Sequence, residues 1–321
     1  RALKRLVSVV QVHPRPPEYN ISSMAIYDCF TYFNEDVILD IRFHTLYKFV
    51  DKFIIVEATR DHSGREKKLN FDINYFKKFS NKIIYIVVDD IPEKVNLHKK
   101  KGYHSNFVRE NYHRNCISRG LSKCLDDDLV MISDADEIPN LLNLDQFKKN
   151  NKFSFFRQKL FKYKFNKACF YNDKEKKLFK TEFADWIGTG ICLKKYLKSP
   201  QWLRDERLKA QKILFFNSNN KFKTFKHFFK YNFLLPKIIE NGGWHFSSVM
   251  TPKDLRVKIE SFAHGEFNNE KYKNIKNIED KINSNIDVFD PTQILKTLKL
   301  DNINFPNYIW ENRDKLAEFI E

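Results

Sequence analysis

The chain contains little glycine and proline, 8 and 10 of its 321 residues. That composition excludes collagen-like and linker-rich architectures. It also lacks any CxxC pair, although it has five cysteines, Cys29, Cys116, Cys124, Cys169 and Cys192. Because the cysteines are also odd in number, we expect reduced thiols and neither a disulfide framework nor a cysteine zinc site.

Long apolar runs are missing as well. No stretch of about 18 apolar residues occurs, so we expect no segment that spans a bilayer. The stretch from Leu6 to Val12 is too short and too interrupted for the core of a signal peptide. We therefore expect a cytoplasmic protein, with the inner face of a membrane as its alternative location. Residues 1–23, which contain three prolines, are expected to lie outside the fold.

Aromatic and basic residues are abundant. The chain has 31 Phe, 14 Tyr and 4 Trp, with 42% hydrophobic and 31% charged residues, which indicates a globular protein with a core. The net charge is +16, which attracts anions such as nucleic acid, an anionic membrane or a phosphorylated substrate. Lys, Asn, Phe and Ile are all frequent, as in proteins from AT-rich genomes, so the charge by itself indicates little.

Strand-like and helix-like segments alternate in the first half. Apolar strands are predicted at 26–33, 53–56, 83–88 and 129–132. Helices are predicted after Asn34, which we expect to cap the first, and at 106–123. This order predicts an open α/β sheet, mostly parallel, with helices on both faces. Ligands bind such sheets at the carboxyl ends of the strands, where Glu57, Asp89–Asp90 and Asp134 stand here.

The second half is less regular. Residues 186–193 resemble a loop that enters a strand, and residues 268–321 are expected to form a C-terminal helical segment packed on a domain of residues 24–267. Lysines and aromatic residues alternate between Lys221 and Tyr231. That pattern fits either a peripheral membrane contact through residues 221–235 or a strand with one buried face.

The most informative motif is Asp134-Ala135-Asp136. It follows the apolar run from Leu129 to Ile132 and precedes Pro139. Two carboxylates at the end of a buried strand can reach the same point, and paired oxygen ligands suit Mn²⁺ or Mg²⁺ when a diphosphate supplies further ligands. A solvated acidic turn is the alternative.

Several motifs occur in one order. They are Val56 to Phe71 (VEATRDHSGREKKLNF), Asp134 to Pro139 (DADEIP), Gly242 to Ser247 (GGWHFS), then Thr251-Pro252, Lys258, Ser261 and Gly265 to Phe267. From about Ile26 to Phe267 the chain resembles glycosyltransferase family 17. The resemblance implies a GT-A-like nucleotide-sugar-binding domain, a UDP-GlcNAc donor, a divalent metal and inversion at the anomeric carbon.

The resemblance also implies roles for individual residues. Asp136 is expected to bind the metal directly, Asp134 to bind it through water or to hold the ribose, and His245 to be the third ligand. A core histidine is the alternative for His245. The residues expected to contact the donor are Glu57, His62, Ser63, Gly64, Arg109, Arg114, Asp134, Trp186 and Trp244. The alternatives are an exposed loop position for His62, an ion pair with Glu110 for Arg114, and a place in the core for the two tryptophans.

An inverting transfer needs a base that deprotonates the acceptor hydroxyl, and we expect a carboxylate. Asp185 is the first candidate, followed by Glu266 and Glu182. A capping role is the alternative for Asp185. Glu266 stands where the family has an aspartate.

The leading hypothesis is a metal-dependent inverting transferase that moves N-acetylglucosamine from UDP-GlcNAc to a glycan hydroxyl. The acceptor would be a surface polysaccharide, a lipid-linked glycan or a glycoprotein. One alternative is a basic nucleic-acid-binding or nuclease-type protein with an acidic metal site, although no nucleic-acid-binding motif is present. Another is a catalytically inactive sugar-binding protein with the same fold.

Overall fold

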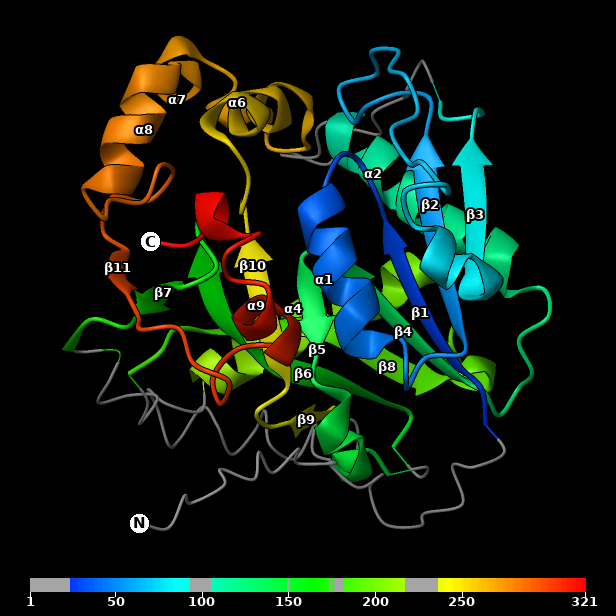
Figure 1. Cartoon of the computed structure of the whole chain (residues 1–321). Helices are drawn as coiled ribbons and strands as arrows, with labels where there is room; N and C mark the ends of the chain where they lie inside the picture. The colour runs from blue at the N-terminus through cyan, green and yellow to red at the C-terminus, as the bar shows by residue number, and fades with distance from the viewer. Residues whose placement is uncertain (1–23, 93–104, 149–150, 174, 176–181, 217–235) are drawn as a thin grey trace, which may run out of the picture.

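The computed structural model describes residues 24–92, 105–148, 151–173, 175, 182–216 and 236–321. The predicted extension 1–23 and segment 221–235 lie outside these residues. The strands are β1 (Ile26–Thr31), β2 (Lys52–Ala58), β3 (Ile83–Val88), β4 (Leu129–Asp134), β5 (Glu137–Pro139), β6 (Phe153–Lys162), β7 (Lys167–Phe170), β8 (Asp185–Leu193), β9 (Lys237–Ile239), β10 (Gly243–Ser247) and β11 (Ile294–Thr297). Within the described ranges they form one eleven-stranded sheet, whose main path is β11-β7-β6-β8-β4-β1-β2-β3 (Figure 1).

The sheet is open and its two halves differ. Strands β3, β2, β1 and β4 pair in parallel, as the alternating pattern predicts. From β4 onward, β8, β6, β7 and β11 pair antiparallel along the path, while β9 and β10 lie parallel to β6. The predicted α/β class is confirmed, and the parallel part is the half built from the first four predicted strands.

The helices are α1 (Asp36–Leu46), α2 (Ser105–Asn115), α4 (Pro200–Phe216), α6 (Pro252–Ser261), α7 (Glu270–Lys273), α8 (Ile275–Asn283) and α9 (Asn307–Glu311). The predicted helix 106–123 is α2 followed by the 3₁₀ turn η2 (Cys116–Leu121). The predicted cap at Asn34 is wrong. Glu35 precedes α1, and its carboxylate accepts hydrogen bonds from the backbone N–H groups of Phe33 and Asn34.

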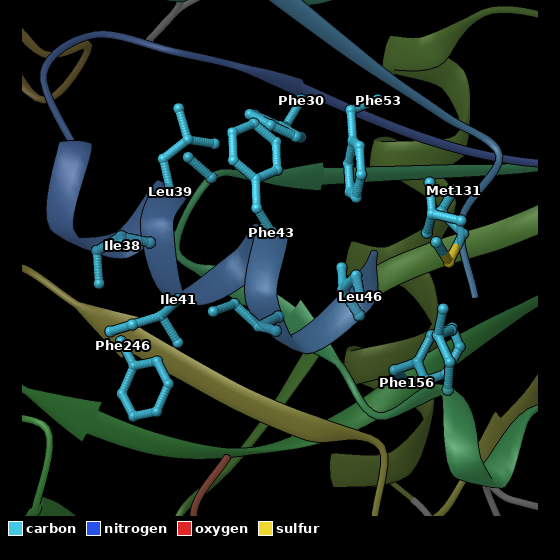
Figure 2. Packing of buried hydrophobic residues seen from close by; sticks show 14 of the residues in the cluster. Phe30, Ile38, Leu39, Ile41, Phe43, Leu46, Phe53, Met131, Phe156 and Phe246 are labelled. Carbon is cyan, nitrogen blue, oxygen red and sulfur yellow. The ribbon is translucent and has the colours of Figure 1, made fainter. Parts of the chain in front are cut away.

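Alternating residues of the parallel strands face two separate cores. On β1, Phe30 packs in the cluster that contains α1, whereas Cys29 packs in the cluster that contains η2. Figure 2 shows the first cluster, with Phe43 of α1 facing Phe30 and Phe53 of the sheet. Residues buried on both faces explain why these strands are continuously apolar.

The C-terminal residues 268–321 contribute more than helices. Helices α7 and α8 pack beside α6 around Leu255, Ile278 and Ile282 (Figure 1). Strand β11 pairs with β7 at the end of the sheet, and α9 packs on α1. Across the described ranges, no helix combines the length and the apolar character needed to cross a membrane.

Candidate functional site

A cleft of about 420 Å³ opens at the carboxyl ends of β1 and β4. Its walls come from the end of β1, the loop after β2, α2, the turn after β4, β10, α6 and the residues that follow α6. The cleft therefore lies where ligands bind an open α/β sheet. Of the three strand ends that carry acids, only β4 contributes its acid, Asp134, to the wall.

Arg42 of α1 holds the turn that carries Asp134 and Asp136. Its guanidinium is completely buried and binds both carboxylate oxygens of Asp28 at 2.6 and 2.7 Å. The same group donates to the Ser133 hydroxyl and to the backbone carbonyls of Asp134, Ala135 and Glu137. One guanidinium thus ties α1 and β1 to the turn and fixes the direction in which the two aspartates leave the sheet.

Asp134 is held by two arginines. Its Oδ1 accepts from Arg114 of α2 at 3.1 Å, and its Oδ2 accepts from Arg204 of α4. Burial would raise the pKa of Asp134, but Arg204 and Arg114 outweigh it and hold that pKa below the usual value. Asp134 therefore stays ionised. Each of its oxygens keeps a further lone pair for a hydroxyl or a water.

Asp136 and His245 meet across the cleft. Asp136 Oδ1 lies 3.5 Å from His245 Nε2, and Oδ2 lies 3.8 Å from Lys258 Nζ. Burial works against ionisation of Asp136, but His245 and Lys258 more than compensate and lower its pKa. His245 comes from β10, which pairs with β5 and so lies beside the turn that carries Asp136.

Asp136 and His245 are the residues that fit a divalent cation. The His245 Nδ1 atom is buried without a hydrogen-bond partner among the described residues, and Nε2 is the nitrogen that faces Asp136. A carboxylate and an imidazole at this separation can share one cation whose other ligands are diphosphate oxygens or water. In the described ranges no group of three His, Cys, Asp or Glu side chains gathers at one point. If a cation binds here, Asp136 and His245 are the two side chains placed to hold it directly, because both carboxylate oxygens of Asp134 already accept from Arg114 and Arg204.

The sequence analysis missed Arg204 and Arg207, two arginines of α4 that lie near Glu137. Glu137 is buried and accepts two hydrogen bonds from Arg204, at 2.6 and 2.8 Å, and one from Trp186 Nε1 at 2.6 Å. Arg207 lies 4.6 Å from the centre of the Trp186 ring, and burial lowers its pKa to about 9. No motif marks the two arginines, because they approach the turn from a helix 70 residues away in sequence.

His62 and His113 form a coupled pair in the cleft wall. His113 Nε2 lies 3.1 Å from the Val56 carbonyl, to which it must donate, so its Nδ1 is the acceptor. His62 Nε2 lies 3.4 Å from that Nδ1 and must donate to it, which leaves the lone pair of His62 on Nδ1. Burial lowers the pKa of both imidazoles. Of the loop residues predicted to contact the donor, His62 is the one that lines the cleft.

The other predicted donor-binding residues near this loop shape it instead. Glu57 is buried and accepts from Lys67, the backbone of Asn70 and Phe71, and the Tyr85 hydroxyl. Ser63 donates to Asp61. Arg109 donates to the Pro92 and His62 carbonyls, and a Cβ at Gly64, where φ is +93°, would lie 2.9 Å from its guanidinium. Glu57, Ser63, Gly64 and Arg109 do not line the cleft, because these contacts direct them toward the loop itself.

Strand alternation takes Asp185 and Trp244 away from the cleft. In the strand register, Asp185 of β8 lies opposite Lys159 of β6, and Lys159 lies opposite Trp244 of β10. Side chains in such a row across neighbouring strands share one face of the sheet. His245 is the next residue and points to the opposite face, toward Asp136. Trp244 instead donates to the Asn304 carbonyl, and Asp185 pairs with Arg157 at 3.2 Å. Burial raises the pKa of Asp185, but its placement does not support the predicted role as base.

The remaining predicted residues divide in the same way. Trp186 contacts His245 at 4.8 Å between ring centres and lies behind it, outside the cleft wall. Glu182 is exposed beside β7 and is also outside it. Glu266 lies in the 3₁₀ turn η5 (Gly265–Phe267), between the cleft-lining residues His264 and Phe267. Of the three candidate bases, only Glu266 stands between cleft-lining residues, although its own side chain is not part of the wall.

Glu35 is an additional acid in the cleft wall. The sequence analysis assigned it no role at the site. Burial raises its pKa, against the opposing influence of Lys258.

Comparison with known proteins gives a consistent family. A sequence profile described as Glycosyltransferase family 17 matches residues 13–176, about half of the chain. The beta-1,4-mannosyl-glycoprotein 4-beta-N-acetylglucosaminyltransferase of Homo sapiens is 29% identical over 110 residues, which are 32% of this chain and 19% of that protein. The Mus musculus protein of the same name is 23% identical over 242 residues, 72% and 41% of the two chains. The chain thus spans less than half the length of these relatives.

Solved structures are more distant. Glucosyl-3-phosphoglycerate synthase from Mycobacterium tuberculosis, in complex with Mn²⁺, UDP and phosphoglyceric acid, has a TM-score of 0.32 and 10% identity, with 90% of this chain and 92% of that one covered. The galactosyltransferase LgtC, in complex with donor and acceptor sugar analogs, has a TM-score of 0.26 and 12% identity over 61% and 65%. Scores this low transfer nothing about the site from those structures to this chain.

Proposed function

This chain belongs to glycosyltransferase family 17 and is a glycosyltransferase, and from that premise we propose that it transfers N-acetylglucosamine from UDP-GlcNAc to a glycan hydroxyl, with inversion and with a divalent metal. The observation that carries the proposal is the placement of Asp134 and Asp136 at the carboxyl end of β4, in a cleft that also holds Arg114 and Lys258. The names of the relatives support the choice of donor sugar.

The cleft offers each part of the donor a chemical partner. Asp134 stays ionised between its two arginines and can accept a ribose hydroxyl or a metal-bound water. Asp136 and His245 would hold the cation, whose chemistry is to neutralise the charge that develops on the departing UDP. Lys258 lies on the same side of the cleft as Asp136 and can bind a diphosphate oxygen. Arg42 and Arg204 keep these groups in place.

The test is isothermal titration of UDP and UDP-GlcNAc, each with Mn²⁺ and with EDTA. We expect binding that needs Mn²⁺ and is tighter for UDP than for GDP or CDP. Asp136→Asn should abolish the metal-dependent binding. Asp145→Asn, which changes an exposed aspartate of the 3₁₀ turn η3 (Leu141–Gln146), should bind as the wild type does. Equal binding with Mn²⁺ and EDTA would contradict the metal requirement, and no binding of any uridine nucleotide would contradict the donor.

A further inference from the structure

The turn after α6 places a histidine and a glutamate at the edge of the cleft. His264 lines the same cleft as Asp134 and Asp136. Its Nδ1 lies 2.8 Å from Glu266 Oε1, and both side chains are 53% exposed. The pair is therefore reachable by a molecule that enters the cleft from solvent.

The hydrogen bond fixes the state of the imidazole. An ionised carboxylate only accepts, so in neutral His264 the proton is on Nδ1 and the lone pair is on Nε2. A base whose second nitrogen is held by a carboxylate is the arrangement that activates hydroxyl nucleophiles in many enzymes. The backbone N–H of Phe267 donates to the His264 carbonyl at 3.2 Å, which keeps the two side chains on the same turn.

Aromatic rings surround the histidine. The ring centres of Phe107, Phe262 and Phe267 lie 5.3, 5.7 and 6.2 Å from that of His264. Phe262 and Phe267, with Phe289, also line the cleft, and these three are half-buried. The cleft thus has a charged part at Asp134 and Asp136 and an aromatic part at His264. Apolar and aromatic walls with a few placed polar groups are typical of sites that bind small molecules.

We propose that the aromatic part of the cleft binds the acceptor carbohydrate and that His264 is the general base, oriented by Glu266. This inference rests on the proposed function. His264 Nε2 takes the proton of the acceptor hydroxyl while the oxygen of that hydroxyl bonds to the anomeric carbon of the donor. The bond from that carbon to the diphosphate oxygen breaks, and its electron pair leaves with UDP. Glu266 stabilises the imidazolium that results. Glu266, predicted as a candidate base, thereby becomes the positioning residue.

The experiment measures UDP release from UDP-GlcNAc with Mn²⁺, with water alone and with methyl β-D-mannopyranoside as the probe acceptor. His264→Gln should reduce kcat by about 10²–10⁴-fold, with the KM for UDP-GlcNAc and the affinity for UDP within about twofold of the wild type, because the donor contacts remain. Glu266→Gln should reduce kcat less. Imidazole should partly restore His264→Ala and leave Glu266→Gln unchanged. His44→Gln, on α1 outside the cleft wall, is the matched control.

Three outcomes separate this inference from the proposed function. A His264→Gln rate within about threefold of the wild type overturns the assignment of the base. Wild-type protein that binds UDP but releases none with water or with the mannoside overturns both the assignment of the base and the proposed transfer, because transfer to either acceptor would release UDP. Wild-type protein that binds no uridine nucleotide shows instead that the proposed function has failed.

Discussion

At the scale of single residues, the site depends on buried charges that hold other charges. Arg42 and Arg204 touch the backbone or the carboxylates of the turn after β4 from two different helices. Burying such groups is costly unless every partner is present. The same partners fix the direction of Asp134 and Asp136, so the positioning of these two carboxylates and the stability of the fold depend on the same contacts.

Arg42→Gln should lower the free energy of unfolding by about 3–5 kcal/mol, because it leaves the carboxylate of Asp28 buried without its ion pair. Urea unfolding followed by circular dichroism measures the change. Arg256→Gln is the control, since Arg256 pairs with Glu260 at 3.3 Å while 47% exposed, and its loss should cost less than about 1 kcal/mol. Equal losses in the two variants would contradict the clamping role of Arg42.

At the scale of elements, the site forms where α2, β10 and the loop after β2 meet the end of β4. These contacts join segments that are distant in sequence. His113 of α2 holds His62 of the loop, and β10 holds His245 beside Asp136 through its pairing with β5. Two predictions test these junctions.

The first concerns pH. Burial lowers the pKa of His62 and His113 in the folded protein. In the unfolded chain the pKa of a histidine is about 6.5, so below that pH the unfolded chain binds more protons than the folded one. Above that pH both histidines are neutral in both states and the folded protein has its full stability. This stability is lost as the pH falls toward the pKa values of the two histidines in the folded protein. The free energy of unfolding should therefore decrease from pH 7 to pH 5, by up to about 1.4 kcal/mol per pH unit for each histidine.

His113→Gln should flatten this slope, whereas His264→Gln, which changes an exposed histidine, should keep it. Urea unfolding at several pH values in a buffer of constant ionic strength measures the slope. A wild-type stability that is flat between pH 7 and pH 5 would show that the pair does not titrate as its burial requires.

The second concerns Gly243, the first residue of β10. Its φ is +117°, and a Cβ there would lie 2.2 Å from the Ile138 carbonyl oxygen of β5. Gly243→Ala should therefore force β10 and β5 apart, lower the melting temperature strongly and weaken binding of Mn²⁺–UDP. Gly265→Ala is the control, because a Cβ there would meet nothing closer than 3.5 Å. Similar melting temperatures of the two variants, by differential scanning fluorimetry, would contradict the predicted clash.

At the scale of the whole molecule, the C-terminal segment is part of the main core. Ile309 of α9 is completely buried in the cluster that contains α1 and the sheet. Ile309→Ala should cost about 2–5 kcal/mol of unfolding free energy, the usual loss for a buried isoleucine. Ile303→Ala, at a position that is 86% exposed, should change it by less than about 0.5 kcal/mol. Equal stability of the two variants in urea would show that the segment is detached from the core.

The parallel half of the sheet and the Asp134–Asp136 turn could be predicted from the sequence alone. Strands buried on both faces are continuously apolar, and a paired acid directly after such a strand is visible as a local pattern. Which residues reach the cleft could not be predicted, because it depends on contacts between segments that are distant in the sequence. Strand alternation placed His245 toward it and Trp244 and Asp185 away from it, while hydrogen bonds drew Glu57 and Arg109 into the loop. Arg204 reaches Asp134 from a helix 70 residues away, a contact that depends on packing and leaves no local pattern.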